Sequence, residues 1–126
     1  MFHSDHSALV IIGHLMVAFL FLYRGITAFP QFDHHLSRFE ARRVPFARIV
    51  LMGGFATMLV GGVMIAVDYY AWVGALGLIL FTVMANFLYH DFWTLEDPQR
   101  RQTHTWIFCN NIAVTGGLFM IVSTSL

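Results

Sequence analysis

The sequence contains no lysine, only one cysteine and few charged residues of either sign. Seven arginines and seven acidic residues give a formal net charge of zero when the histidines are neutral. Nucleic-acid binding requires a strongly basic surface, so we expect no nucleic-acid partner. The single cysteine, Cys109, excludes an intrachain disulfide or dithiol pair, and we expect it to serve in helix packing.

Apolar residues are abundant instead: 58% of the chain is hydrophobic and only 11% is charged. Most of them fall in four stretches, at residues 8–29, 46–67, 71–92 and 104–125. A stretch of about 22 residues forms a helix long enough to cross a hydrocarbon core of about 30 Å. The sequence therefore predicts an all-α, polytopic integral membrane protein. We expect residues 1–126 to form one membrane domain, a four-transmembrane-helix bundle in the lipid bilayer.

The links between these stretches differ in length and character. Residues 68–70 form a very short turn, which makes the second and third helices antiparallel neighbours. The longer link between the first two stretches has apolar residues at helical spacing within about 32–43. This pattern predicts a short helix in the plane of the headgroups, with an irregular loop as the alternative.

The arginines are distributed unevenly along the chain. The first and third links and the adjacent helix ends contain Arg24, Arg38, Arg42, Arg43, Arg48, Arg100 and Arg101. The other ends of the four stretches contain none. By the positive-inside rule, we expect both of these links to be cytoplasmic and both termini to be periplasmic, in a multi-pass protein of the bacterial inner membrane.

Small residues repeat at helical spacing in the second stretch. Gly53, Thr57 and Gly61 lie on one face, and Gly62 continues the stripe one residue on. Small residues let helix backbones approach closely in a membrane, so we predict helix packing at these positions. A groove that admits a ligand close to the backbone is the alternative. The pair at Gly116 and Gly117 in the fourth stretch receives the same packing role.

Polar side chains inside membrane spans are costly and therefore informative. They cluster toward the arginine-rich side, and the candidate ligand-binding residues are His90, Asn86, Tyr89, Trp93, His104 and Asn111. Amide, imidazole and phenol groups beside aromatic rings would suit a quinone or another flat, lipid-soluble ligand. Ordinary interfacial aromatic residues and interhelical hydrogen bonds are the alternative reading. Arg24 and Asp91, at similar depth, are predicted to neutralise each other.

Seven histidines raise the question of haem or a metal. A membrane b-type haem requires two imidazoles facing each other at equal depth on different helices. His14 lies toward one side of the membrane, whereas His90 and His104 lie toward the other. His34 and His35 are adjacent in a link. We therefore expect no haem, no metal site and no covalently bound cofactor.

Several motifs together resemble the DoxX family over essentially the whole chain. They are Tyr89 to Trp93, then Gln102, His104 and Asn111 to Gly117, together with Gly25 and the pair at Gly61 and Gly62. This resemblance implies a four-helix bacterial inner-membrane protein, in a family named for a subunit of a thiosulfate:quinone oxidoreductase. Two positions depart from the family pattern. Asn110 replaces a frequent lysine, and Thr57 and Met58 replace a glutamate.

The function predicted from these observations is an accessory or anchoring subunit of a larger membrane redox complex, binding quinone near the cytoplasmic side. In this reading the chain is not catalytic by itself, because it has almost no mass outside the bilayer and no evident set of redox ligands. Other membrane subunits or a second copy of the chain are the expected partners. The rival prediction is a lipid or small-solute handling protein, or a structural assembly factor without a redox role.

Overall fold

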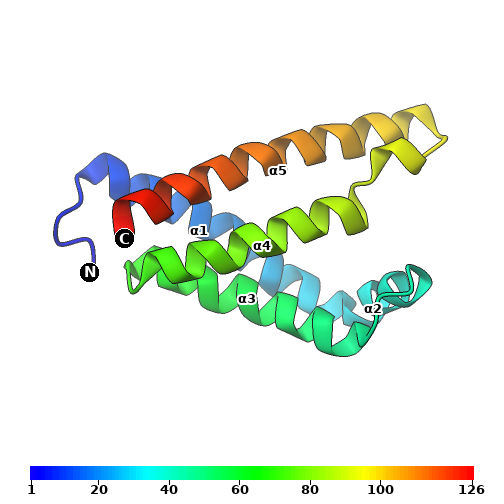
Figure 1. Cartoon of the computed structure of the whole chain (residues 1–126), viewed down its shortest axis with the longest axis horizontal. Coiled ribbons are helices and arrows are strands. Elements are labelled where there is room, and N and C mark those ends of the chain that lie inside the picture. The colour runs from blue at the N-terminus through cyan, green and yellow to red at the C-terminus, as the bar shows by residue number, and fades with distance from the viewer.

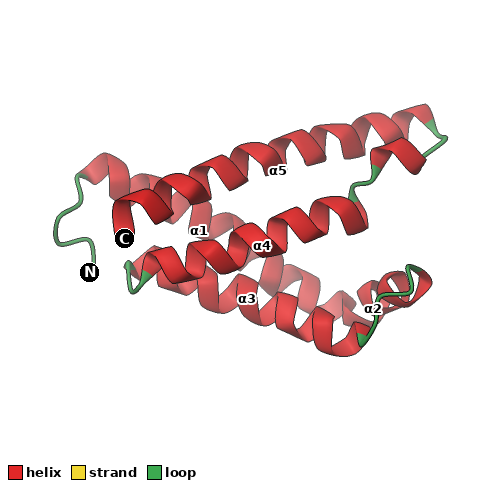
Figure 2. Ribbon diagram, in the orientation of Figure 1, coloured by secondary structure: helices red, strands yellow, loops and turns green.

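The computed structural model describes residues 1–126, and helices are its only regular secondary structure (Figure 2). The elements in chain order are α1 (Ala8–Ala28), the 3-10 helix η1 (Phe29–Gln31), α2 (Phe32–Ala41), α3 (Ala47–Val67), α4 (Ala71–Tyr89), the 3-10 helix η2 (Phe92–Thr94) and α5 (Pro98–Ser125). Four helical segments are long and apolar enough to cross a membrane. The predicted all-helical membrane protein with four spans is therefore confirmed.

The long helices run alternately up and down, and both chain termini lie at the same end of the bundle (Figure 1). Helix α3 packs between α1 and α4, and α5 packs against α4. Helices α1 and α5 make far less contact with each other. The α3–α4 turn is very short, with Asp68 and Tyr70 in the left-handed conformation, and these two helices are the antiparallel neighbours that the sequence predicts.

The helix boundaries differ from the predicted ones at the end opposite the termini. Helix α5 begins at Pro98 rather than at residue 104 because Asp97 caps it: the Asp97 side chain accepts a hydrogen bond from the Gln99 N–H at 3.2 Å. Proline at the first helical position is also favourable. Helix α4 ends at Tyr89, before the predicted residue 92, since His90 leaves the helical conformation.

The link between α1 and α3 is helical, as α2, rather than irregular. It packs against α3 and buries Phe39. Figure 1 shows α2 at the end of the bundle opposite the termini. This position brings polar residues of α2 close to the ends of α1 and α4.

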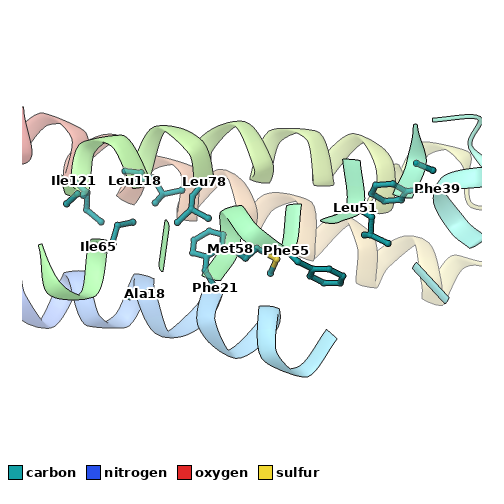
Figure 3. Packing of buried hydrophobic residues seen from close by; sticks show 13 residues of the cluster. Ala18, Phe21, Phe39, Leu51, Phe55, Met58, Ile65, Leu78, Leu118 and Ile121 are labelled. Atoms are coloured by element: carbon teal, nitrogen blue, oxygen red, sulfur yellow. The ribbon is translucent and has the colours of Figure 1, made fainter. Parts of the chain in front are cut away.

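The core lies between α3, α4 and α5, from which Ile65, Leu78 and Leu118 respectively supply the largest fully buried side chains (Figure 3). Only 23 of the 126 residues are buried. Large apolar side chains such as Leu9 and Met120 are instead 81% and 71% exposed. An apolar outer surface of this kind suits lipid rather than water as the surrounding solvent.

Glycines allow the closest helix approaches in the bundle. A Cβ atom on Gly61 would lie 3.2 Å from the Gly74 carbonyl oxygen, and one on Gly62 would lie 2.9 Å from Leu22. Gly61 therefore sets the α3–α4 contact, and Gly62 sets the α3–α1 contact.

The other residues assigned to packing have fewer neighbours. Nothing lies within 4 Å of the Cβ position of Gly53 or Gly116, and Gly117 reaches only Val17, at 3.9 Å. The Thr57 hydroxyl donates a hydrogen bond to the Gly53 carbonyl oxygen of its own helix, at 2.7 Å.

Candidate functional site

A cavity lies between α1, α3 and α4, with α2 across its end. Its volume is about 670 Å³, and 12 of its 22 lining residues are hydrophobic. Ligand pockets typically measure about 300–1,000 Å³ and combine apolar walls with a few polar groups. The cavity thus has the size and lining of a small-molecule site.

Small residues of two neighbouring helices leave this space open. Gly53 and Thr57 on α3 and Gly77 on α4 line the cavity. A side chain added at Gly53 would meet no atom within 4 Å, because the glycine faces the open space. The small residues of α3 that were predicted to pack helices therefore have two roles. Gly61 lies at a close contact with α4, whereas Gly53 forms part of the cavity wall.

The polar lining residues gather at one end of the cavity, next to α2. Arg24 comes from α1, His35 and Arg38 from α2, and Tyr89 and His90 from the end of α4. No aspartate or glutamate lines the cavity. The polar end therefore offers mostly hydrogen-bond donors and positive charge, and the rest of the lining is apolar.

Tyr89 holds the donors of α2 in place. Its hydroxyl oxygen lies 3.3 Å from Nδ1 of His35. The guanidinium carbon of Arg38 lies 4.7 Å from the centre of the Tyr89 ring, within the range of a cation–π contact. Phe39 also packs against this ring, with the ring centroids 5.6 Å apart.

Two of the six predicted ligand-binding residues, Tyr89 and His90, line the cavity. Asn86 and Asn111 instead bind each other: the Asn111 amide donates to the Asn86 oxygen at 2.8 Å. The Asn86 amide donates in turn to the Phe108 carbonyl oxygen at 3.3 Å. Both asparagines are buried, so they form an interhelical contact between α4 and α5, which was the alternative reading of these residues.

The remaining two predicted residues, His104 and Trp93, are not among the residues that line the cavity. Nδ1 of His104 lies 3.1 Å from Nδ1 of His90, so His104 can orient the His90 ring. Trp93 lies in η2, outside the helical face that was predicted to hold it, and packs against Phe87 and Phe108. It is 49% exposed.

The charge pair in the structure differs from the predicted one. Asp91 accepts two hydrogen bonds from the Arg42 guanidinium, at 2.5 and 2.9 Å, rather than from Arg24. Thr94 donates a further bond to the same carboxylate at 3.1 Å. The hydrogen bonds to Asp91 raise the pKa of Arg42 above its ordinary value. The partner differs because α2 carries Arg42 to the end of α4, which leaves Arg24 beside the cavity.

The contribution of α2 to the cavity was not predicted from the sequence. His35, Arg38 and Phe39 follow a spacing of i, i+3 and i+4, which places them on one helical face. That signal was present, but the sequence does not say which way a short interfacial helix turns this face.

The chemistry of this lining is that of a binding site. Imidazole, phenol and guanidinium groups donate hydrogen bonds to carbonyl or anionic oxygens, and the apolar walls accommodate a ring or chain. The one cysteine, Cys109, is exposed on α5 and is not among the lining residues.

Comparison with known proteins places the chain in a family. No curated protein and no solved structure matches it. The family model of DoxX matches residues 9–91, which is more than half of the chain. The matched region extends from α1 to just beyond α4 and includes every residue that lines the cavity. This multi-pass membrane protein is therefore a member of the DoxX family.

Proposed function

We propose that the chain is an accessory subunit of a redox complex in the bacterial inner membrane and that its cavity binds a quinone. The observation that carries this proposal is the division of the cavity into an apolar part and one donor-rich end. Quinone carbonyl oxygens require donors, while the ring and tail require apolar contact. His35, Tyr89 and His90 would supply the donors.

The exposure of the lining residues supports entry from the bilayer. Gly53 is exposed and Leu80 is 64% exposed, although both line the cavity. Both lie in apolar helices whose outer surface faces lipid. A quinone dissolved in the hydrocarbon could therefore enter between the helices without crossing an aqueous phase.

A partner chain completes the proposed function. The lining groups can hold a quinone and orient its oxygens, but a two-electron reduction also needs an electron donor. Few residues of this chain lie outside the spans to dock such a donor. In the proposal, another subunit delivers the electrons and this chain holds the acceptor.

A second candidate function is favoured by the two arginines at the polar end. Arg24 and Arg38 line the cavity without a carboxylate among the lining residues. An anionic lipid headgroup could therefore occupy the site that we assign to the quinone carbonyls. This alternative corresponds to a lipid-handling role.

Filling the cavity tests the binding proposal. Gly53→Leu would place a side chain in the open space, and we expect the purified protein to lose its co-extracted quinone, measured by chromatography of the organic extract. Gly116→Leu is the matched control because Gly116 also has nothing within 4 Å and does not line the cavity. Equal quinone content in both variants would contradict the proposal. Retention of an anionic phospholipid alone, lost in Gly53→Leu, would favour the second function.

Adjacent histidines provide a second test of the donor end. His35→Phe should weaken binding of a short-chain ubiquinone by about tenfold or more, equivalent to about 1.4 kcal/mol. His34→Phe should leave the affinity unchanged, since His34 is exposed and does not line the cavity. Titration of the quinone into each protein in detergent micelles measures these affinities. His90→Phe should weaken quinone binding relative to the same His34→Phe control.

The redox partner requires its own experiment. Native mass spectrometry of the gently solubilised complex should detect a dehydrogenase or cytochrome subunit bound to this chain. A homo-oligomer that retains only lipid would argue against the accessory role.

A further inference from the structure

The segment before α1 folds back over the end of the bundle where the termini lie (Figure 1). The backbone N–H of Phe2 donates to the Asp68 carbonyl oxygen, and the backbone N–H of His3 donates to the Asp68 carboxylate, both at 2.9 Å. Phe2 and His3 have φ values of 56° and 61°, a conformation that is costly for residues other than glycine. These contacts hold His3 against the α3–α4 turn.

This fold brings three histidines together at the entrance to α1. The ring centroids of His3, His6 and His14 lie 5.0 to 5.1 Å apart in every pairing. Each ring offers one nitrogen, and these three nitrogens lie within 4.8 Å of one another. The cluster is separate from the cavity, which lies toward the other end of the bundle.

Backbone carbonyl groups determine which ring nitrogens are free. Nε2 of His3 lies 2.9 Å from the Ala66 carbonyl oxygen, and Nδ1 of His14 lies 2.9 Å from that of Val10. A carbonyl oxygen only accepts, so each of these nitrogens carries the proton. Nδ1 of His3 and Nε2 of His14 therefore keep their lone pairs. A histidine that binds a metal commonly donates its other N–H to a backbone carbonyl in this way.

The cluster leaves hydrogen-bonding capacity unused. His14 is 2% exposed, and its Nε2 has no hydrogen-bond partner. Burying a polar atom without a partner is costly, whereas a metal ion would use its lone pair. Nδ1 of His3 lies 2.9 Å from Nδ1 of His6, and a hydrogen bond between them gives both of these nitrogens a partner. Nε2 of His14 is still left without one.

The carboxylate of Asp68 lies next to the three histidines. Oδ2 of Asp68 lies 3.7 Å from Nδ1 of His6, and Asp68 is 7% exposed. A buried negative charge next to three imidazoles compensates the charge of a divalent cation. Three nitrogen ligands and one oxygen ligand match the coordination of zinc.

We propose that His3, His6, His14 and Asp68 form a binding site for a divalent transition-metal ion of the zinc class. The three histidines supply the ligand nitrogens, and the Asp68 carboxylate supplies a fourth ligand or the balancing charge. The site ties the chain before α1 to the α3–α4 turn. Its occupancy therefore stabilises the end of the bundle that carries both termini.

Metal analysis of the purified protein tests the site directly. The full chain is prepared in detergent without a polyhistidine tag, stripped with chelator and dialysed against Zn²⁺. We expect about one zinc per chain by elemental analysis, and a higher melting temperature with Zn²⁺ than with chelator, since a ligand that binds only the folded state stabilises it. A stripped wild-type chain that takes up no zinc would overturn the proposal.

Variants separate a metal site from a hydrogen-bonded histidine cluster. His3→Ala and His6→Ala should each weaken zinc binding by at least about tenfold. Removing a residue that only hydrogen-bonds to a metal ligand already weakens metal binding by about 10- to 100-fold. Asp68→Asn keeps an acceptor for the His3 N–H and should weaken binding without preventing folding. His34→Ala, on the exposed face of α2, is the matched control and should bind as the wild type does.

Melting temperatures of the variants show whether zinc binds at the histidine cluster or elsewhere on the protein. In the proposal, Zn²⁺ raises the melting temperature of the wild type and of His34→Ala but not that of His3→Ala. If zinc raised the melting temperature of all of these proteins equally, the ion would bind elsewhere and the assignment would be wrong.

Discussion

At the residue scale, Asp91 shows how this chain keeps a carboxylate near the membrane surface. Its side chain is only 8% exposed, and it receives hydrogen bonds from Arg42 and Thr94. A buried carboxylate that loses its donors pays the full cost of leaving water. Arg24, by contrast, is exposed and lines the cavity without an ion pair. The two arginines therefore have different roles.

Replacing Arg42 by leucine should consequently destabilise the protein by about 1–3 kcal/mol, because it leaves the Asp91 carboxylate with fewer donors. The measurement is thermal unfolding in detergent, followed by intrinsic fluorescence. Arg24→Leu is the control and should leave the melting temperature nearly unchanged. A larger loss in Arg24→Leu than in Arg42→Leu would restore the pair predicted from the sequence.

The sequence was sufficient for some residue roles and insufficient for others. Depth in the membrane could be counted, so Arg24 and Asp91 were placed at similar levels. Depth does not give the angle around a helix axis or the path of a link. The arrangement of α2 decides that Arg42 reaches Asp91 and that His35 reaches Tyr89. The same limitation concealed the proposed metal site, since His3 precedes the first apolar stretch and nothing in its spacing indicates that the chain folds back.

At the element scale, α3 is the helix against which α1, α2 and α4 pack. It contacts α1 and α4 along its length and α2 at one end. Gly61 and Gly62 allow these contacts to be close, and Gly53 leaves the cavity open. Periodicity of small residues indicated that this face was special. It could not divide the face into a packed part and an open part, because the division depends on side chains of neighbouring helices such as Leu78.

A larger side chain at position 61 should therefore separate α3 from α4. Gly61→Leu places a side chain against the Gly74 carbonyl oxygen and Leu78, and we expect lower yield and a lower melting temperature in detergent. Gly13→Leu is the same substitution at a helical position with open space around it, and it should be tolerated. Similar losses at both positions would show that helix propensity or synthesis, and not packing, limits the yield.

At the scale of the whole molecule, the apolar stretches predicted four spans because length and composition alone decide whether a helix can cross a bilayer. Their ends were less predictable, since caps such as Asp97 and the departure of His90 from α4 act locally. The two termini lie at one end, and α2 and η2 lie at the other (Figure 1). Most arginines, including Arg42 and Arg100, belong to that other end.

This asymmetry leads to a topological prediction. An alkaline-phosphatase fusion after Leu126 should be active, and a fluorescent-protein fusion at the same site should be dark, because the positive-inside rule places the arginine-rich end in the cytoplasm. Reporters inserted between η2 and α5 provide the complementary measurement and should behave in the opposite way. A fluorescent fusion at Leu126 would reverse the proposed orientation.

The position of the cavity along the chain has a consequence for biosynthesis. All of its lining residues lie between Arg24 and His90, so every wall of the cavity has been synthesised before α5 begins at Pro98. Membrane chains are made from the N-terminus onward, and early segments can associate while later ones are still being translated. Until α5 arrives, the Asn86 side chain on α4 lacks the Asn111 partner that it has in the finished bundle. Helix α5, which follows the cavity-lining helices in the chain, thus completes the far side of α4 after the cavity walls have been made.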